Sequence, residues 1–183
     1  MPDINTDAGL VVAANYSADQ KSNLQLHVIR GVSKTVDLPN PNNYLYTYPK
    51  FAKDGKSVIS AVRNDKGKMA LIETEIESNK ETVFIPFSDA TIAYVQVYGD
   101  SVLFTSSQQE GDVIFLFNKT KNQLSKIADL PNGNYQGVLD QRTNSIVWNT
   151  FTADGTMLLK QPLQSLQIKT VEKLGAVPDL YLS

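Results

Sequence analysis

The chain has 183 residues, of which 42% are hydrophobic and 20% are charged, and its formal net charge is −2. This composition fits one folded globular domain or one block of a repeat array, and it lacks the basic excess of nucleic-acid-binding proteins. With no cysteine and one histidine, the chain cannot form disulfides, thiolate metal centres or a multi-histidine metal site.

The predicted elements are short strands throughout. Runs rich in Val, Ile, Leu, Tyr and Phe, bounded by turn-forming residues, favour strands, and no sustained helical periodicity is present. Pairs such as Asp54-Gly55 and Asp154-Gly155 supply turns. The expected strands, in chain order, are the end of a first strand, then 9–15, 24–30, 34–38, 44–52, 56–63, 68–76, 80–85, 91–98, 101–107, 112–118, 122–128, 134–140, 144–151, 156–162 and 166–172.

An internal repeat organises these strands. Ser57, Ser101 and Ser145 each open a similar apolar run, and they are spaced by 44 residues twice. The runs that begin at residues 69, 113 and 157 keep the same period. A period near 44 with four strands per unit predicts an all-β fold, a β-propeller of about four four-stranded antiparallel blades. A β-sandwich is the rival fold, but it does not need a strict repeat.

We place the blades at about 1–42, 43–88, 89–132 and 133–174, with the start of a further blade at 175–183. Together they form a single propeller segment over residues 1–183. The chain begins and ends inside a first strand of the repeat, which favours a partial array from a larger propeller. Alternatively, residues 177–183 pair with the first blade and close a four-bladed ring.

The segment from Tyr48 to Val58, with Pro49, Phe51, Asp54 and Gly55 in it, resembles the TolB-type (WD40-like) propeller repeat of bacterial envelope proteins. The third and fourth copies keep the strand pattern but lack the Pro-x-Phe head. The resemblance implies a propeller fold, a periplasmic or cell-surface setting in a bacterium, and a protein or peptide partner. Because propellers carry many unrelated functions, it does not imply an activity.

No catalytic or metal-binding constellation is predicted. His27 lies in a third strand without a Gly-x-Ser-x-Gly turn to present a nucleophile, so we interpret it as a hydrogen-bonded residue of a blade face. Glu73, Glu75 and Glu77 alternate along a strand, which would allow a cation site or an acid/base pair but is more typical of a solvated or outer-edge face. No Walker loop, zinc-protease pair or calcium loop occurs, so no cofactor is expected, and no apolar run is long enough for membrane insertion.

The candidate binding residues lie in the connections between blades. Tyr44, Tyr46 and Tyr48 alternate, so we expect their side chains to share one face that a partner contacts. Alternatively, these tyrosines pack between blades and the asparagines only turn the chain. The full set of candidates is Asn40, Asn42, Asn43, Tyr44, Tyr46, Tyr48, Asp89, Asn132, Asn134 and Tyr135, with Ser88 beside them.

Two functions of different classes remain. The first is a non-catalytic interaction or ligand-binding module of a bacterial envelope protein, with a protein or peptide partner and a glycan or small molecule as a further option. The second is the gating propeller of an oligopeptidase-like serine hydrolase whose catalytic domain lies outside this chain.

Overall fold

The computed structural model describes residues 2–17, 22–108, 111–128, 130–131 and 133–175. The chain divides into two compact units, residues 1–87 and 88–183, and each is described by itself. Sixteen strands and one short 3-10 helix make up the regular structure of the described residues, so the predicted all-β class is confirmed.

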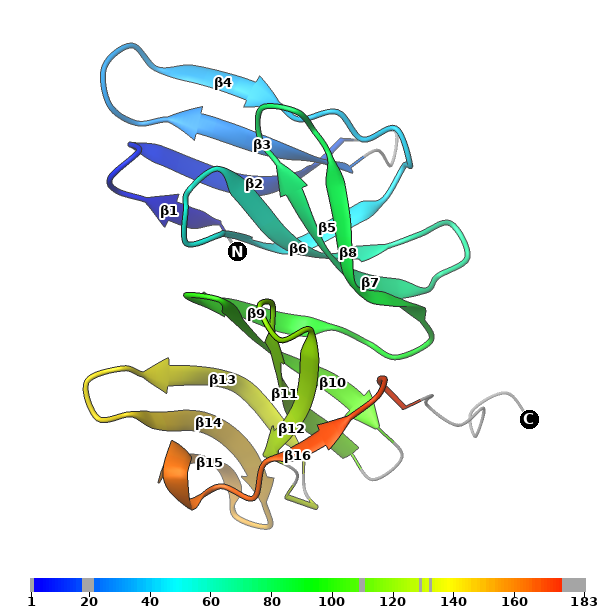
Figure 1. The fold of residues 1–183 in the computed structure, drawn as a ribbon, viewed down its shortest axis with the longest axis vertical. Coiled ribbons are helices and arrows are strands. Elements are labelled where there is room, and N and C mark those ends of the chain that lie inside the picture. Colours follow the sequence, from blue (N-terminus) through cyan, green and yellow to red (C-terminus); the bar gives the residue numbers. More distant parts are fainter. Residues whose placement is uncertain (1, 18–21, 109–110, 129, 132, 176–183) are drawn as a thin grey trace. The chain divides into compact units, whose positions relative to one another are not determined.

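The first unit contains two four-stranded antiparallel sheets (Figure 1). Each sheet follows the chain order of its strands, as a propeller blade does. Strand β5 packs against β1, β2 and β3, so the first strand of the second sheet covers the first sheet. The strands are β1 (Asp3–Asn5), β2 (Leu10–Tyr16), β3 (Ser22–Val28), β4 (Lys34–Asp37), β5 (Leu45–Phe51), β6 (Ser57–Arg63), β7 (Met69–Glu75) and β8 (Glu81–Ser88).

The second unit repeats this packing, because β13 packs against β9, β10 and β11. Its sheets have the orders β16-β12-β11-β10-β9 and β13-β14-β15. The strands are β9 (Ala93–Tyr98), β10 (Ser101–Gln108), β11 (Gly111–Asn118), β12 (Gln123–Ala128), β13 (Asn134–Asp140), β14 (Ser145–Thr152), β15 (Gly155–Pro162) and β16 (Lys169–Val171), and a 3-10 turn, η1 (Leu163–Ser165), follows β15.

One strand lies in a sheet that the repeat does not predict. The segment 166–172, expected as the fourth strand of the fourth blade, contributes β16, which pairs with β12 instead (Figure 1). Three residue pairs join them, from Leu124↔Val171 to Lys126↔Lys169. The described part of the fourth sheet therefore has three strands, and the third sheet has five.

The 44-residue period corresponds to real structural equivalence. Ser57, Ser101 and Ser145 each begin the second strand of their sheet. Along β14 the buried residues alternate with more exposed ones, so that Ile146 and Trp148 point into the core of the second unit. The core of the first unit is formed by Val12, Leu24, Leu26, Leu38, Tyr46, Phe51, Val58, Val62, Ala70 and Ile72, and that of the second by Leu103, Ile114, Ile127, Ala128, Ile146 and Trp148.

A bulge recurs in the first strand of three sheets. The backbone is left-handed at Tyr48 (φ 51 degrees), Tyr94 (φ 54 degrees) and Gln136 (φ 53 degrees). Each lies where the pairing register with the second strand shifts. A bulge bends the strand and redirects its side chains, so strict alternation does not cross it.

Candidate binding site

Two asparagines, Asn40 before β5 and Asn134 at the start of β13, bind backbone groups of neighbouring segments. Asn40 donates through Nδ2 to the carbonyls of Ser22 (2.6 Å) and Tyr44 (2.8 Å), and its Oδ1 accepts the Tyr44 N–H (3.0 Å). Ser22 begins β3, so this side chain ties the connection to the preceding sheet. Both polar atoms of the Asn40 amide are thus occupied within the chain.

Asn134 plays the same part in the second unit. Its Nδ2 donates to the carbonyls of Asp112 (2.9 Å) and Leu130 (3.1 Å), and its Oδ1 accepts the indole N–H of Trp148 (3.0 Å). Asn134 is fully buried, with 0% of its surface exposed. Asn40 and Asn134 therefore hold the connections, and their contact with a partner stays a prediction.

The three tyrosines do not share one face. The rings of Tyr44 and Tyr46 lie 6.5 Å apart, but Tyr46 is 1% exposed and belongs to the core, with Tyr44 packed against it. The register shift between Thr47 and Lys50 breaks the alternation before Tyr48. The expected three-tyrosine face is wrong, because the sequence pattern assumed a regular strand where the structure has a bulge.

Glu81, which no sequence pattern singled out, brings two candidates together. One of its carboxylate oxygens accepts from the Tyr46 hydroxyl (3.3 Å), and the other accepts from Asn42 Nδ2 (3.0 Å). Burial and the neighbouring Glu81 carboxylate raise the pKa of Tyr46 above its usual range, and Tyr44 is shifted in the same direction for the same reasons. Glu81 lies 37 residues beyond Tyr44 in the chain, so only the fold could reveal the contact.

A polar groove of about 380 Å³ opens beside Asn40 and Asn43 in the first unit. The amide side chains of Asn15, Asn23 and Asn43 belong to its lining. Asn15 faces Asn23 across the β2–β3 ladder. The described lining is Asn15, Ser17, Ser22, Asn23, Asp37, Leu38, Asn40 and Asn43.

In the second unit the connection residues meet a carboxylate. The Tyr135 hydroxyl donates to Asp112, and burial together with Asp112 raises the pKa of Tyr135 to about 12. Ser107 Oγ also donates to Asp112 (2.6 Å). Asp89 is exposed, Ser88 ends β8, and Asn132 lies outside the described residues.

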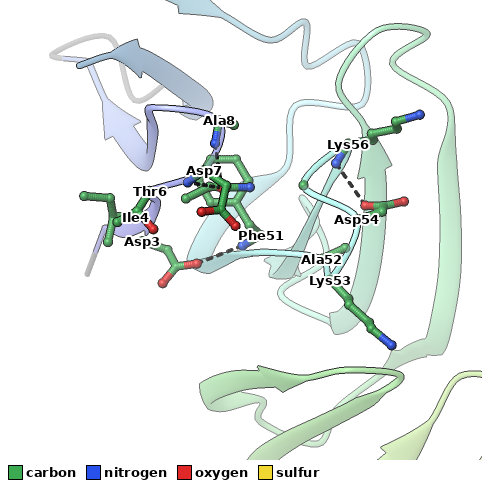
Figure 2. A pocket seen from close by; sticks show the side chains of 12 residues that line it. Asp3, Ile4, Thr6, Asp7, Ala8, Phe51, Ala52, Lys53, Asp54 and Lys56 are labelled. Atoms are coloured by element: carbon green, nitrogen blue, oxygen red, sulfur yellow. Dashed lines mark hydrogen bonds between the residues drawn. The ribbon is translucent and has the colours of Figure 1, made fainter. Parts of the chain in front are cut away.

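A second, open groove of about 550 Å³ lies between the turn after β1 and the turn after β5 (Figure 2). In its lining, the Asp3 carboxylate accepts a hydrogen bond from the Phe51 N–H (2.9 Å) and forms an ion pair with Lys50 Nζ (3.2 Å). Figure 2 shows Asp54 turned back to the Lys56 N–H, the 2.9 Å hydrogen bond of the turn. Asp3 and Asp54 therefore serve a strand contact and a turn, respectively.

The residues considered for catalysis are not assembled into a site. His27 lies on β3, where its Nδ1 hydrogen-bonds to Thr35 Oγ1 (3.1 Å), as expected for a blade-face histidine. Glu75 accepts from Ser78 at the end of β7, and Glu77 lies beyond that strand. In the described part of the chain, no three metal-ligating side chains come together and no helix is long and apolar enough to cross a membrane.

No protein-family model and no curated protein matches the chain. Solved structures do. TolB from Acinetobacter baumannii superimposes with a TM-score of 0.71 at 14% identity, over 92% of this chain and 42% of that one. The chain has a TolB-like β-propeller fold.

The same TolB-like fold occurs within peptidases. A puromycin-hydrolyzing peptidase from Mycobacterium tuberculosis matches with a TM-score of 0.72 at 8% identity, over 97% of this chain and 30% of that one. A structure from a study of two prolyl endopeptidases gives 0.64 at 9% identity, over 96% and 28%. The chain spans less than two thirds of the length of each of these solved chains, so it forms a partial array relative to them.

Proposed function

We propose that this TolB-like segment is a non-catalytic module that binds a protein partner in a bacterial envelope, in the periplasm or at the cell surface. The observation that carries the proposal is the polar groove of the first unit, which the amides of Asn15, Asn23 and Asn43 line. Amide side chains donate and accept together, so they suit the backbone of an extended peptide. The similarity to TolB supports the setting.

Capture from a bacterial envelope extract on immobilised chain tests this proposal. We expect at least one protein to be retained, and to be lost on Asn23→Ala and on Asn43→Ala. Both residues are less than fully buried and outside the core, so the variants should keep the fold. Gln141→Ala, another exposed polar residue, is the matched control. Retention that is unchanged in both groove variants contradicts the proposed site.

The alternative is a gating propeller of a serine hydrolase, and the fold matches to peptidases are the observation behind it. Under this alternative the chemistry resides in another domain of the parent polypeptide. Sequencing the source gene across both ends of this segment separates the two functions. An adjacent α/β domain with a Gly-x-Ser-x-Gly turn supports the hydrolase, whereas further propeller repeats with an envelope-targeting segment support the interaction module.

A further inference from the structure

Two neutral side chains of the described residues hold Asp112 in place. Its Oδ1 accepts from Ser107 Oγ (2.6 Å), and the Tyr135 hydroxyl supplies a second hydrogen bond. Thr91 Oγ1 accepts the Ser107 N–H (3.1 Å) and lies 2.7 Å from Ser107 Oγ, to which it donates because Ser107 gives its own proton to Asp112. No Lys or Arg among the described residues pairs with Asp112, so its negative charge is fixed in position but not neutralised.

Tyr135, whose hydroxyl meets this carboxylate, belongs to an aromatic pair. The rings of Tyr135 and Phe151 meet edge to face, with centroids 5.2 Å apart, and Phe151 is 51% exposed. The Tyr135 ring is seated on Gly133, where an added Cβ would lie 2.6 Å from the hydroxyl oxygen. Tyr94, at the bulge of β9, is close enough to affect the Tyr135 hydroxyl electrostatically.

The geometry points to a site for a cationic side chain of a protein partner, a Lys ammonium or Arg guanidinium, at Asp112, Tyr135 and Phe151. A carboxylate already oriented by two donors keeps lone pairs free for a charge-assisted hydrogen bond. The faces of adjacent aromatic rings attract the same cation. Because the ring, the hydroxyl and the carboxylate are fixed in the free protein, little ordering is required on binding.

This inference rests on the proposed function, since it assigns the chemistry of the partner, but it concerns a different unit from the amide groove. The amide groove and the cationic site can therefore be refuted independently of each other. Loss of partner capture on the groove variants with no response to cations would refute the cationic site alone.

Titration of the 183-residue chain with acetyl-Gly-Arg-Gly-amide tests the site. Binding is measured by the NMR chemical shifts of the Asp112 amide and the Phe151 ring. For one ion pair with an aromatic contact, we expect a dissociation constant on the order of 1–10 mM that weakens with added salt. Acetyl-Gly-Lys-Gly-amide should give shifts at the same residues. The peptide with citrulline, which keeps the shape of arginine without its charge, should bind at least roughly five-fold more weakly.

Asp112→Asn should weaken the arginine peptide by roughly five-fold or more, because it keeps the acceptor for Ser107 but removes the charge. Phe151→Leu keeps apolar bulk without the aromatic face and should weaken it by roughly two- to five-fold. Asp100→Asn, at an exposed turn of the same unit, is the control and should leave binding unchanged. Equal affinity for the arginine and citrulline peptides, or unaltered affinity in Asp112→Asn, overturns the site.

Discussion

Replacing Asn134 by alanine should be among the most damaging single changes in the second unit. The substitution removes two hydrogen bonds to carbonyls and one from the Trp148 indole, at a side chain with no exposed surface. Each buried group left without a partner costs about 1–3 kcal/mol, and partial relaxation makes three such losses less than additive. We therefore expect the free energy of unfolding to fall by about 3–5 kcal/mol.

Urea unfolding followed by the fluorescence of Trp148, the single tryptophan, measures this loss in the unit that contains it. Asn40→Ala is the matched variant, because Asn40 makes three similar hydrogen bonds but is only partly buried. Water can replace some of those bonds, so we expect the free energy of unfolding to fall by about 1–2 kcal/mol. Circular dichroism in urea measures this fall. A loss below about 1 kcal/mol for Asn134→Ala, or a larger loss for Asn40→Ala, would refute the reasoning.

Three further predictions concern packing and ionisation. Gly137→Ala places a Cβ 2.9 Å from Ile114 Cδ1 in the core, so the free energy of unfolding should fall by about 1–3 kcal/mol in urea titrations. The pKa of Tyr135 is raised in the folded state to about 12 from 10.0, so stability is intact below pH 10 and falls as pH rises toward 12. Tyr135→Phe should flatten that fall in urea midpoints measured from pH 9 to 12, and an unchanged slope would contradict the assignment. Asp140, partly exposed and hydrogen-bonded by Lys160, has a pKa lowered to about 2, and Lys160→Met should move that pKa toward 3.8 in an NMR titration with little change in stability.

The strand content was readable from the sequence because local patterns encode it. Ser57, Ser101 and Ser145 occupy equivalent ladder positions, and a repeated hydrophobic pattern with turn pairs is enough to locate such positions. The expected strands agree with the structure within a few residues at most ends, the usual scatter of strand boundaries.

The candidate site was less readable because it depends on contacts between distant segments. The bulge at Tyr48 adds a residue without changing the apolar pattern, so the alternation of the tyrosines was extended too far. Glu81 and Asp112 accept hydrogen bonds from candidate side chains, and these contacts form only in the folded chain. Asn40 and Asn134 look like ordinary turn residues in the sequence, and their bonds to Ser22 and Asp112 could not be inferred from it.

The pairing of β16 with β12 shows that the sequence repeat and the β-sheet do not have the same boundaries in this chain. Residues 169–171 lie within the fourth copy in sequence but form a fifth strand of the third sheet, where Gln123 Nε2 also donates to Thr170 Oγ1 (2.8 Å). The third sheet therefore includes a strand encoded outside the third copy. Cutting the chain at a repeat boundary would expose the backbone edge of β12, so fragments for expression should be chosen by sheet membership, with residue 171 kept wherever β12 is kept.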